Sequence, residues 1–226
     1  MELIREKSSF YKYWHKKLQF LDVHYHANPD SFKRRYHPIE AGSIYQKNSG
    51  ACVLKNHLGS TTAFAQVAQS MQLPVFGSIV LNDIAGGLSA KPIQQSLTQY
   101  SFAHSGRLMV HLPTIVPTTH KSSMKRVKAN KYVDLFANKS LGLLDAQKKL
   151  KSDIKHLIEF IQQNSLVLST GHASKREIYI LLEYIDELGY NFPIMLNQPA
   201  NPITNMNADE LLSLEKKIGF LLNKRH

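Results

Sequence analysis

The sequence predicts an α/β protein built as a TIM-like (β/α) barrel, and three observations support this prediction. Short apolar runs bounded by turn signals alternate with helical segments along the chain. Strict alternation of strands and helices indicates parallel strands with helices covering the sheet. A polar side chain that can bind ligands follows nearly every apolar run, as expected where a barrel active site forms at the carboxyl ends of the strands.

Six predicted strands recur at intervals of about 25 to 30 residues, the length of one βα unit, with one longer interval. They cover residues 18–23, 51–54, 75–81, 108–113, 166–170 and 192–196. The side chains that follow or end them are His26, His57, Asn82, His111, His172 and Asn197. A doubly wound sheet would be expected to carry a glycine-rich phosphate loop after its first strand, and the sequence has none.

Helix boundaries support the same prediction. Pro38 suits the first turn of a helix that ends before Gly50. Ser174 and Glu177 form a capping box, and Gly189 ends the helix that they begin. Further helices are predicted over residues 145–164 and 208–217, the second with a less typical start signal at Asn207 and Glu210.

The chain is short for a full barrel. It has 226 residues, whereas eight βα units take about 250. Residues 218–223 could form a seventh strand, and none remain for an eighth. We therefore expect a single barrel domain over residues 1–226 that is seven-stranded or incomplete, whether open, truncated or completed by a partner chain. A helical extension at 1–17 and an inserted loop at 116–140 are expected within it.

Composition limits the class of protein. Hydrophobic residues make up 43% and charged residues 20%, as in soluble globular proteins. No run approaches the roughly 18 apolar residues that cross a bilayer, and residues 1–20 lack the pattern of a signal peptide. Cys52 is the single cysteine and cannot form an intrachain disulfide. We therefore expect a cytoplasmic protein with no membrane partner.

The net charge leaves more than one class of partner open. Lysine and arginine number 28 against 17 acidic residues, a formal net charge of +11. Such a balance can accompany binding to nucleic acids or to anionic substrates. The densest basic run, residues 121–131, has no interleaved aromatic residue. A solvated loop or helix face is favoured over a phosphate-binding patch, and a nucleic-acid partner is not expected.

His24 and His26 stand two residues apart at the end of the first predicted strand. Because side chains alternate along a strand, both imidazoles are expected on one face, together with Asp22. Two adjacent imidazoles form half of a site for a divalent metal ion. The alternative is a hydrogen-bonded pair at a strand end. We predict His24 and His26 as metal ligands, because later strands end in similar residues.

Lys55 and His57 share a face at the end of the second predicted strand. A lysine that points into a barrel mouth is unfavourable unless it is paired or functional. Lys55 could bind an anionic group of the substrate or, once carbamylated, bridge two metal ions; otherwise it reaches water at the rim. We predict Lys55 as a catalytic residue and His57 as a further residue of the metal site.

Later strands supply the remaining candidates. Gly171 allows a sharp turn that directs His172 into the mouth, so His172 is predicted as a metal ligand rather than a hydrogen-bonding residue at a helix entry. His111 has apolar neighbours and is either a satisfied core histidine or a residue of the site. The residues predicted to contact substrate are Asn82, His111 and Asn197.

Asp83, in the polar loop after the third strand, is a candidate general base, with a turn carboxylate as the alternative. Neutral imidazoles leave a divalent ion positively charged, which lowers the pKa of its water toward neutrality for attack on a carbonyl or phosphoryl centre. A serine or cysteine nucleophile is disfavoured, because the chain has no Gly-x-Ser-x-Gly turn and Cys52 lies within a strand. The histidines predicted to lie at the surface are His15, His37, His104, His120 and His156.

Four ordered segments resemble the DUF6282 group, metal-dependent hydrolase-like proteins of the amidohydrolase superfamily. The segments are 22–26, 54–57, 77–82 with Gly86 and Gly87, and 170–172. The resemblance runs from about residue 18 to residue 218. It implies a TIM-like barrel, a divalent metal ion with zinc favoured, and hydrolysis at the barrel mouth.

Two positions depart from that group. Similar members carry a histidine after the sixth strand, where this chain has Asn197, and the usual aspartate of the last strand has no counterpart. Asparagine binds such metals poorly compared with imidazole. Two hypotheses follow: a metal-dependent hydrolase acting on a small substrate, anionic if Lys55 binds it, or a degenerate barrel that binds without turnover. A homo-oligomer is compatible with both.

Overall fold

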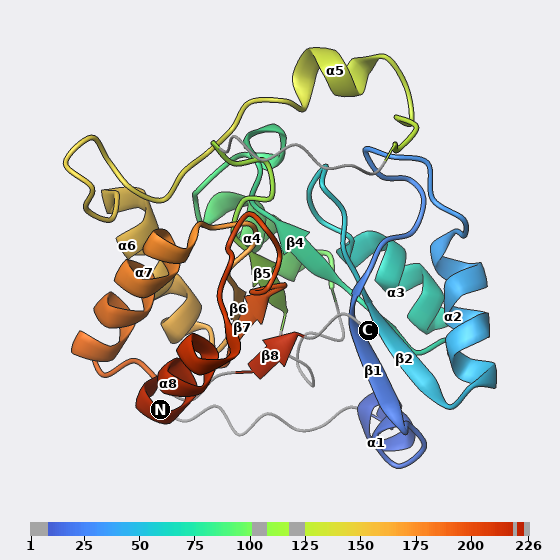
Figure 1. Cartoon of the computed structure of the whole chain (residues 1–226). Helices are drawn as coiled ribbons and strands as arrows, with labels where there is room; N and C mark the ends of the chain where they lie inside the picture. Colours follow the sequence, from blue (N-terminus) through green and yellow to red (C-terminus); the bar gives the residue numbers. More distant parts are fainter. Residues whose placement is uncertain (1–8, 101–107, 118–124, 219–220, 224–226) are drawn as a thin grey trace.

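The computed structural model describes residues 9–100, 108–117, 125–218 and 221–223. Its strands form two parallel sheets whose order follows the chain, β1-β2-β3 and β4-β5-β6-β7-β8 (Figure 1). An α/β class with parallel strands is therefore confirmed. The strands are β1 Phe20–Tyr25, β2 Gly50–Leu54, β3 Val75–Phe76, β4 Ser78–Val80, β5 Met109–His111, β6 Val167–Ser169, β7 Ile194–Asn197 and β8 Leu221–Asn223.

Gly77 divides the third predicted strand into β3 and β4. A Cβ at this position would lie 2.9 Å from Cα of Thr62, so glycine allows the strand to pass close to the following helix. Because β4 continues directly from β3, the two sheets form one series in which the strand order never reverses. A doubly wound sheet does reverse its order, which this series does not do.

The pairing of β8, the last described strand, shows whether the strand series closes into a barrel. β8 pairs in parallel with β7, which confirms the predicted seventh strand. Within the described residues no ladder joins β8 to β1, and a closed barrel is not found. In the described part of the chain, no helix is both long and apolar enough to span a bilayer.

Helices lie on the outer side of the strands, with α2 and α3 beside β1 and β2 and with α6, α7 and α8 beside the later strands (Figure 1). The predicted capping box is present, because Ser174 Oγ accepts from the Glu177 N–H while Ser174 N–H donates to the Glu177 carboxylate. The helices are α1 Ser9–His15, α2 Pro38–Lys47, α3 Thr62–Ser70, η1 Asp83–Ala85 (a 3₁₀ turn), α4 Lys91–Thr98, α5 Tyr132–Phe136, α6 Ser152–Gln163, α7 Lys175–Glu187 and α8 Ala208–Ile218.

The core lies between the strands and these helices. Apolar residues spaced three and four apart on α6 and α7 are buried, so each helix turns one stripe toward the sheet. Buried strand residues such as Ile79, Val110 and Leu168 complete the same cluster. The stripes consist of Ile154, Leu157, Ile158 and Ile161 on α6 and of Ile178, Leu181, Leu182 and Ile185 on α7.

The predicted start of the helix before β6 is wrong. α6 begins at Ser152, whereas the segment from Asp145 forms a turn. The Asp145 side chain accepts a hydrogen bond from the Lys149 N–H at 2.9 Å, and Lys148 has a φ of +61°. A short acidic side chain that bonds the nearby backbone competes with helix formation, which explains the later start.

The prediction that Asp22 lies on the same face as His24 and His26 is wrong, because β1 contains a bulge. The register between β1 and β2 shifts between Asp22 and Tyr25, so strict alternation fails there. The Asp22 carboxylate accepts a hydrogen bond of 2.5 Å from the Tyr45 hydroxyl of α2, on the helix-covered side. Asp22 therefore does not join the two histidines, whose rings still lie side by side.

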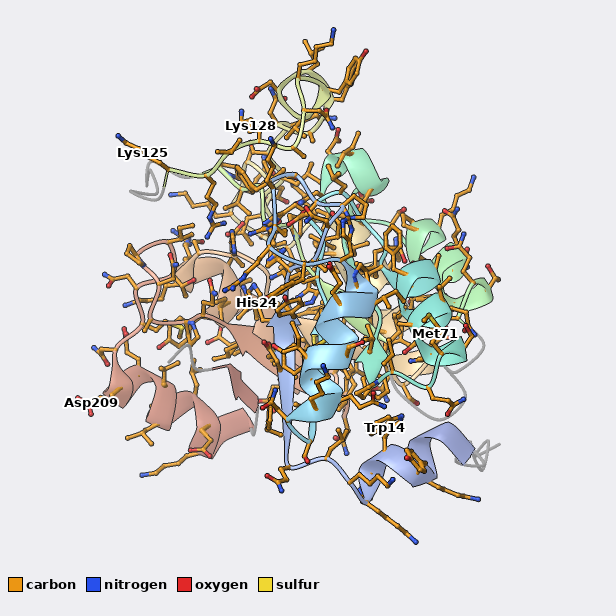
Figure 2. The ribbon with its side chains drawn as sticks, turned by 90° about the vertical axis from the view of Figure 1, so that its right-hand side faces the viewer. Trp14, His24, Met71, Lys125, Lys128 and Asp209 are labelled. Atoms are coloured by element: carbon orange, nitrogen blue, oxygen red, sulfur yellow. The ribbon has the colours of Figure 1, made fainter. Side chains whose placement is uncertain are left out.

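The segment after β5 returns to the loop that follows β1. Lys33 N–H donates to the Val127 carbonyl, and Ala129 N–H donates to the Ser31 carbonyl, each at 2.9 Å. Figure 2 places Lys125 and Lys128 at the end of the molecule opposite Trp14 of α1, with His24 between them. The insertion therefore crosses the end of the molecule where β1 delivers its histidines.

Gly171 offers a test of how the backbone places His172. Gly171 has a φ of +59°, and an added Cβ would lie 2.2 Å from the Leu112 carbonyl oxygen. Gly189 has a similar φ of +62° but no atom within 4 Å of such a Cβ. Gly189→Ala should lower the free energy of unfolding by about 1 to 2 kcal/mol through strain alone. Gly171→Ala should cost clearly more, as measured by urea unfolding, and equal losses would contradict this account.

Candidate metal centre

Five histidines from four strands or strand ends form one continuous set of ring contacts. His24 lies 5.3 Å from His26 and 6.5 Å from His111, measured between ring centroids. His57 lies 4.7 Å from His26 and 6.5 Å from His172. The structure therefore brings together all four predicted metal-site histidines and His111, although they are separated widely in sequence.

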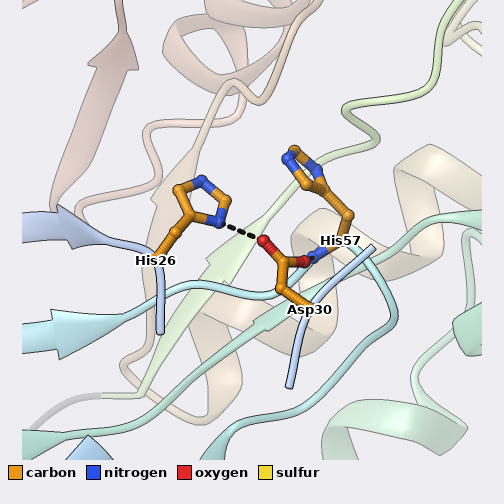
Figure 3. Close-up of side chains that lie close together, drawn as sticks. All are labelled: His26, Asp30 and His57. Atoms are coloured by element: carbon orange, nitrogen blue, oxygen red, sulfur yellow. Dashed lines mark hydrogen bonds and ion pairs between the residues drawn. The ribbon is translucent and has the colours of Figure 1, made fainter. Parts of the chain in front are cut away.

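Asp30 joins this cluster from the loop after β1. His26, Asp30 and His57 could hold a metal ion, because one ligand atom of each lies within 4.8 Å of the others (Figure 3). His24 and His172 lie outside this set of three. The sequence prediction included His26 and His57 but missed Asp30, whose signal is a carboxylate four residues beyond His26 in the loop that leaves the strand.

The hydrogen bonds of Asp30 point to an orienting role. Its Oδ1 accepts from the Ser31 N–H at 2.8 Å and from the His57 N–H at 3.0 Å. Its Oδ2 accepts from His26 Nδ1 at 2.9 Å and from Arg34 Nε at 2.7 Å. A carboxylate has about four lone-pair positions, and these donors use them. Asp30 therefore holds His26 and His57 in position.

Thr114, after β5, orients two further rings. His57 Nδ1 lies 2.8 Å from Thr114 Oγ1, and His172 Nδ1 donates to the Thr114 carbonyl oxygen at 2.8 Å. Together with the Asp30–His26 bond, these contacts engage Nδ1 of three imidazoles. A metal-binding histidine commonly donates its second nitrogen to a carboxylate or carbonyl in this way. The arrangement leaves Nε2 of His26, His57 and His172 as the nitrogen that can bind a metal ion.

His111 is fully buried, and neither of its ring nitrogens has a hydrogen-bond partner among the described residues. The expectation of a satisfied core histidine is therefore wrong. A buried polar group without a partner is unfavourable by about 1 to 3 kcal/mol. The His111 ring lies beside the His24 ring, within the cluster. A ligand bound there would give the His111 nitrogens a partner.

Lys55 is only 1% exposed, so the alternative of a lysine reaching water at the rim is wrong. Its Nζ lies 3.4 Å from Oδ1 of Asn197, across the strand series from β2 to β7. Asn197 Nδ2 also donates to the Gly171 carbonyl at 2.8 Å. Asn197 therefore links Lys55 to the turn that carries His172, at the position where a histidine was expected.

Asn82 and Asp83 occupy structural positions. Asn82 uses its whole side chain, since Nδ2 donates to the His57 carbonyl and to Thr114 Oγ1 while Oδ1 accepts from the Thr114 and Ile115 N–H groups. Asp83 forms an ion pair of 2.7 Å with Lys139 of the insertion. These contacts favour the anchoring of loops over substrate contact by Asn82 or proton transfer by Asp83.

Burial keeps the imidazoles neutral. Burial, followed by the charge of Lys55, lowers the pKa of His172 to about 3 and that of His111 well below its usual value. Burial, followed by the charge of His26, lowers the pKa of His57 in the same way, and burial lowers the pKa of His26. Neutral imidazole is the form that binds a metal ion, so these four rings need no deprotonation at neutral pH.

Unlike the imidazoles, the Asp30 carboxyl group stays in its charged form. Burial would raise the pKa of its carboxyl group, but the His26 hydrogen bond and the neighbouring charges of His57 and Arg34 outweigh burial. The net effect holds the pKa of Asp30 well below its usual range. An acceptor that remains ionised fixes His26 Nδ1 as a donor.

A cavity of about 350 Å³ adjoins the cluster at His57 and His172. The loop after β1 lines it with Phe32, and the segment after β5 lines it with Thr114 and the two following apolar residues. The insertion adds a further wall, including Arg126. A small molecule held in this cavity would lie beside two of the candidate metal ligands.

Comparison with known protein families matches residues 19–222 to a family of unknown function (DUF6282). The chain belongs to the DUF6282 family. No curated protein and no solved structure matches it. The resemblance seen in the sequence is confirmed at the level of this family, whose description assigns no activity, so the function of this DUF6282 protein has to be argued from its site.

Asp30→Asn tests the orienting carboxylate. Asparagine keeps the shape but removes a charge from a side chain that bonds His26, Arg34 and two backbone N–H groups. Breaking such a buried arrangement should lower the free energy of unfolding by about 3 to 5 kcal/mol. In folded protein, zinc affinity should fall by about 10- to 100-fold. Glu210→Gln, which removes a carboxylate paired with Lys175, is the control; equal behaviour of the two variants would refute the role of Asp30.

The lowered pKa values predict loss of stability in mild acid. Between about pH 6.5, the ordinary histidine pKa, and the pKa of His172 near 3, the unfolded chain binds more protons than the folded protein. The free energy of unfolding of metal-free protein should therefore fall as pH drops from 7 to 5. The contribution of His172 approaches about 1.4 kcal/mol per pH unit.

The measurement is urea unfolding at both pH values with His172→Gln, which should weaken the pH dependence. The exposed His156 supplies the matched variant, His156→Gln, which should leave the pH dependence unchanged. An unchanged slope in His172→Gln would contradict the burial argument. The contribution of ionised Asp30 to the free energy of unfolding should be lost only at lower pH, below the ordinary carboxyl pKa of about 4.

Proposed function

We propose that this protein is a metal-dependent hydrolase that acts on a carbonyl or phosphoryl centre of a small substrate. The observation that carries the proposal is the engagement of Nδ1 in His26, His57 and His172 by Asp30 and Thr114. Three neutral imidazoles are thereby prepared to bind through Nε2 next to a cavity. We further propose zinc as the ion, a seven-stranded relative of the TIM-like barrel as the fold, and membership of the amidohydrolase superfamily.

The residues present fit a divalent metal ion by their chemistry. Imidazole nitrogen suits zinc and similar ions, and three protein ligands leave a position open for reaction. The nitrogens of His111, which have no partner among the described residues, lie in a ring beside His24 and could bind a ligand in the same cluster. When bound, such an ion would supply Lewis-acid chemistry and lower the pKa of a water molecule toward neutrality.

The chain's own residues have defined tasks in this proposal. Asp30 and Thr114 hold the imidazoles in one orientation, and Lys55 keeps a buried positive charge near them. That charge favours an anionic group, such as the oxygen that develops negative charge during attack. Hydrolysis needs water alone as co-reactant, since its hydroxyl joins the acyl or phosphoryl centre and its proton goes to the leaving group.

A second candidate is a protein that keeps the fold and the metal but has no turnover. One observation favours it: none of the described residues lining the cavity is acidic, and the oxygens of Asp30 are already used. No described residue that lines the cavity could therefore supply a carboxylate as general base. A cytoplasmic location and a homo-oligomeric state remain predictions under both candidates.

Metal analysis tests the shared part of the two candidates. Protein purified without chelator should contain about one or two divalent ions per chain, and His26→Ala, His57→Ala and His172→Ala should each lose most of this metal. His156→Ala, at an exposed position outside the cluster, is the matched control and should keep it. Unchanged metal in the cluster variants would rule out the proposed centre.

Activity separates the two candidates. Metal-loaded protein should hydrolyse at least one class in a panel of esters, amides, lactones and phosphate esters, and Lys55→Met should reduce the rate while retaining metal. Bound metal without turnover over the whole panel would favour the binding protein. Full activity in Lys55→Met would remove the catalytic role of Lys55.

A further inference from the structure

We infer that the substrate is a small amphipathic anion whose charged end is bound by Arg126 and Lys128 of the insertion. This inference rests on the proposed function, since it assigns the substrate class of the same site. The reacting end of the molecule would lie at His57 and His172. The apolar part would lie along the wall between these two ends.

The position of the two cations supports this assignment. Arg126 and Lys128 both line the cavity that also contains His57 and His172. The segment that carries them is held by the ladder to the loop after β1, where Phe32 and Lys128 form a backbone bridge. The cations therefore belong to a fixed wall of the cavity rather than to a free loop.

The charged residues that line the described part of the cavity, apart from its histidines, are cations. None of the described lining residues is acidic, whereas two are cationic. The Arg126 guanidinium lies over the Phe32 ring, 5.6 Å from its centroid, and Lys128 forms an exposed ion pair with Asp134. Cations that line the cavity favour binding of an anionic group of the substrate.

The size and polarity of the cavity limit the rest of the molecule. Liquid water takes about 30 Å³ per molecule, so a cavity of about 350 Å³ holds roughly a dozen non-hydrogen atoms. Beside the polar Ser31, Thr114 and Asn138, the cavity is lined by the aliphatic residues Ile115, Val116, Val133, Ala137 and Ile203. A nucleotide would place a polar sugar against these aliphatic side chains. A carboxylate with a short aliphatic or aromatic body fits better.

Calorimetric titration of metal-free protein tests the inference without a contribution from metal–carboxylate bonds. The probes are hexanoate, phenylacetate and N-acetylleucine, each compared with the neutral amide of the same acid. At least one acid should bind about tenfold more tightly than its amide, because a charge-assisted hydrogen bond is worth roughly 1.5 to 3 kcal/mol. Equal binding, or no binding, of all three pairs would overturn the inference.

Matched variants locate the preference. Arg126→Met and Lys128→Met should each reduce the preference for the acid by severalfold, and Arg126→Lys should retain part of it. Lys125→Met is the control, because Lys125 extends away from the molecule (Figure 2) and does not line the cavity. An unchanged preference in both Met variants would overturn the assignment.

The metal content of every protein is measured in parallel. Wild-type protein that binds metal but does not prefer the acids would contradict this inference alone. Wild-type protein that prefers the acids but binds no metal would contradict the proposed hydrolase, and would leave Arg126 and Lys128 as the anion site of a binding protein.

Discussion

Asp30 gathers donors from three segments of the chain around one buried carboxylate. His26 contributes a ring nitrogen at the end of β1, Arg34 contributes its guanidinium, and the backbone N–H of His57 comes from the end of β2. A buried charge is unfavourable unless such donors satisfy it. The carboxylate therefore fixes the loop after β1, the orientation of His26 and the position of His57 together.

The strand series supplies the other half of the arrangement. Parallel strands in chain order deliver His24, His57, His111 and His172 to one region, although they derive from distant parts of the sequence. Thr114 then connects two of these rings through a single residue, and Asn82 holds Thr114 in place. The histidines are thus set by the fold, and their orientation is set by a few buried polar residues.

Much of this could be predicted from the sequence, because apolar periodicity and turn residues are local signals. The strands, the capping box at Ser174 and the role of Gly171 follow from such signals. The β1 bulge that turns Asp22 toward Tyr45 could not be predicted, since it depends on pairing with β2. The roles of Asp30 and Thr114 were equally hidden, because their partners lie on other loops. Nothing in the local sequence of either residue indicates which side chains it contacts in the folded protein.

Asp30 and Thr114 engage Nδ1 of His26, His57 and His172, and our proposal requires that Nε2 of these rings binds the metal ion. Long-range ¹H–¹⁵N correlation spectra of metal-free protein at neutral pH report the tautomer of each histidine. The account predicts neutral rings with the proton on Nδ1 for His26 and His172, and a shift of the Nε2 resonances of His26, His57 and His172 when zinc is added. Rings protonated on Nε2, or Nε2 resonances that do not respond to zinc, would contradict it.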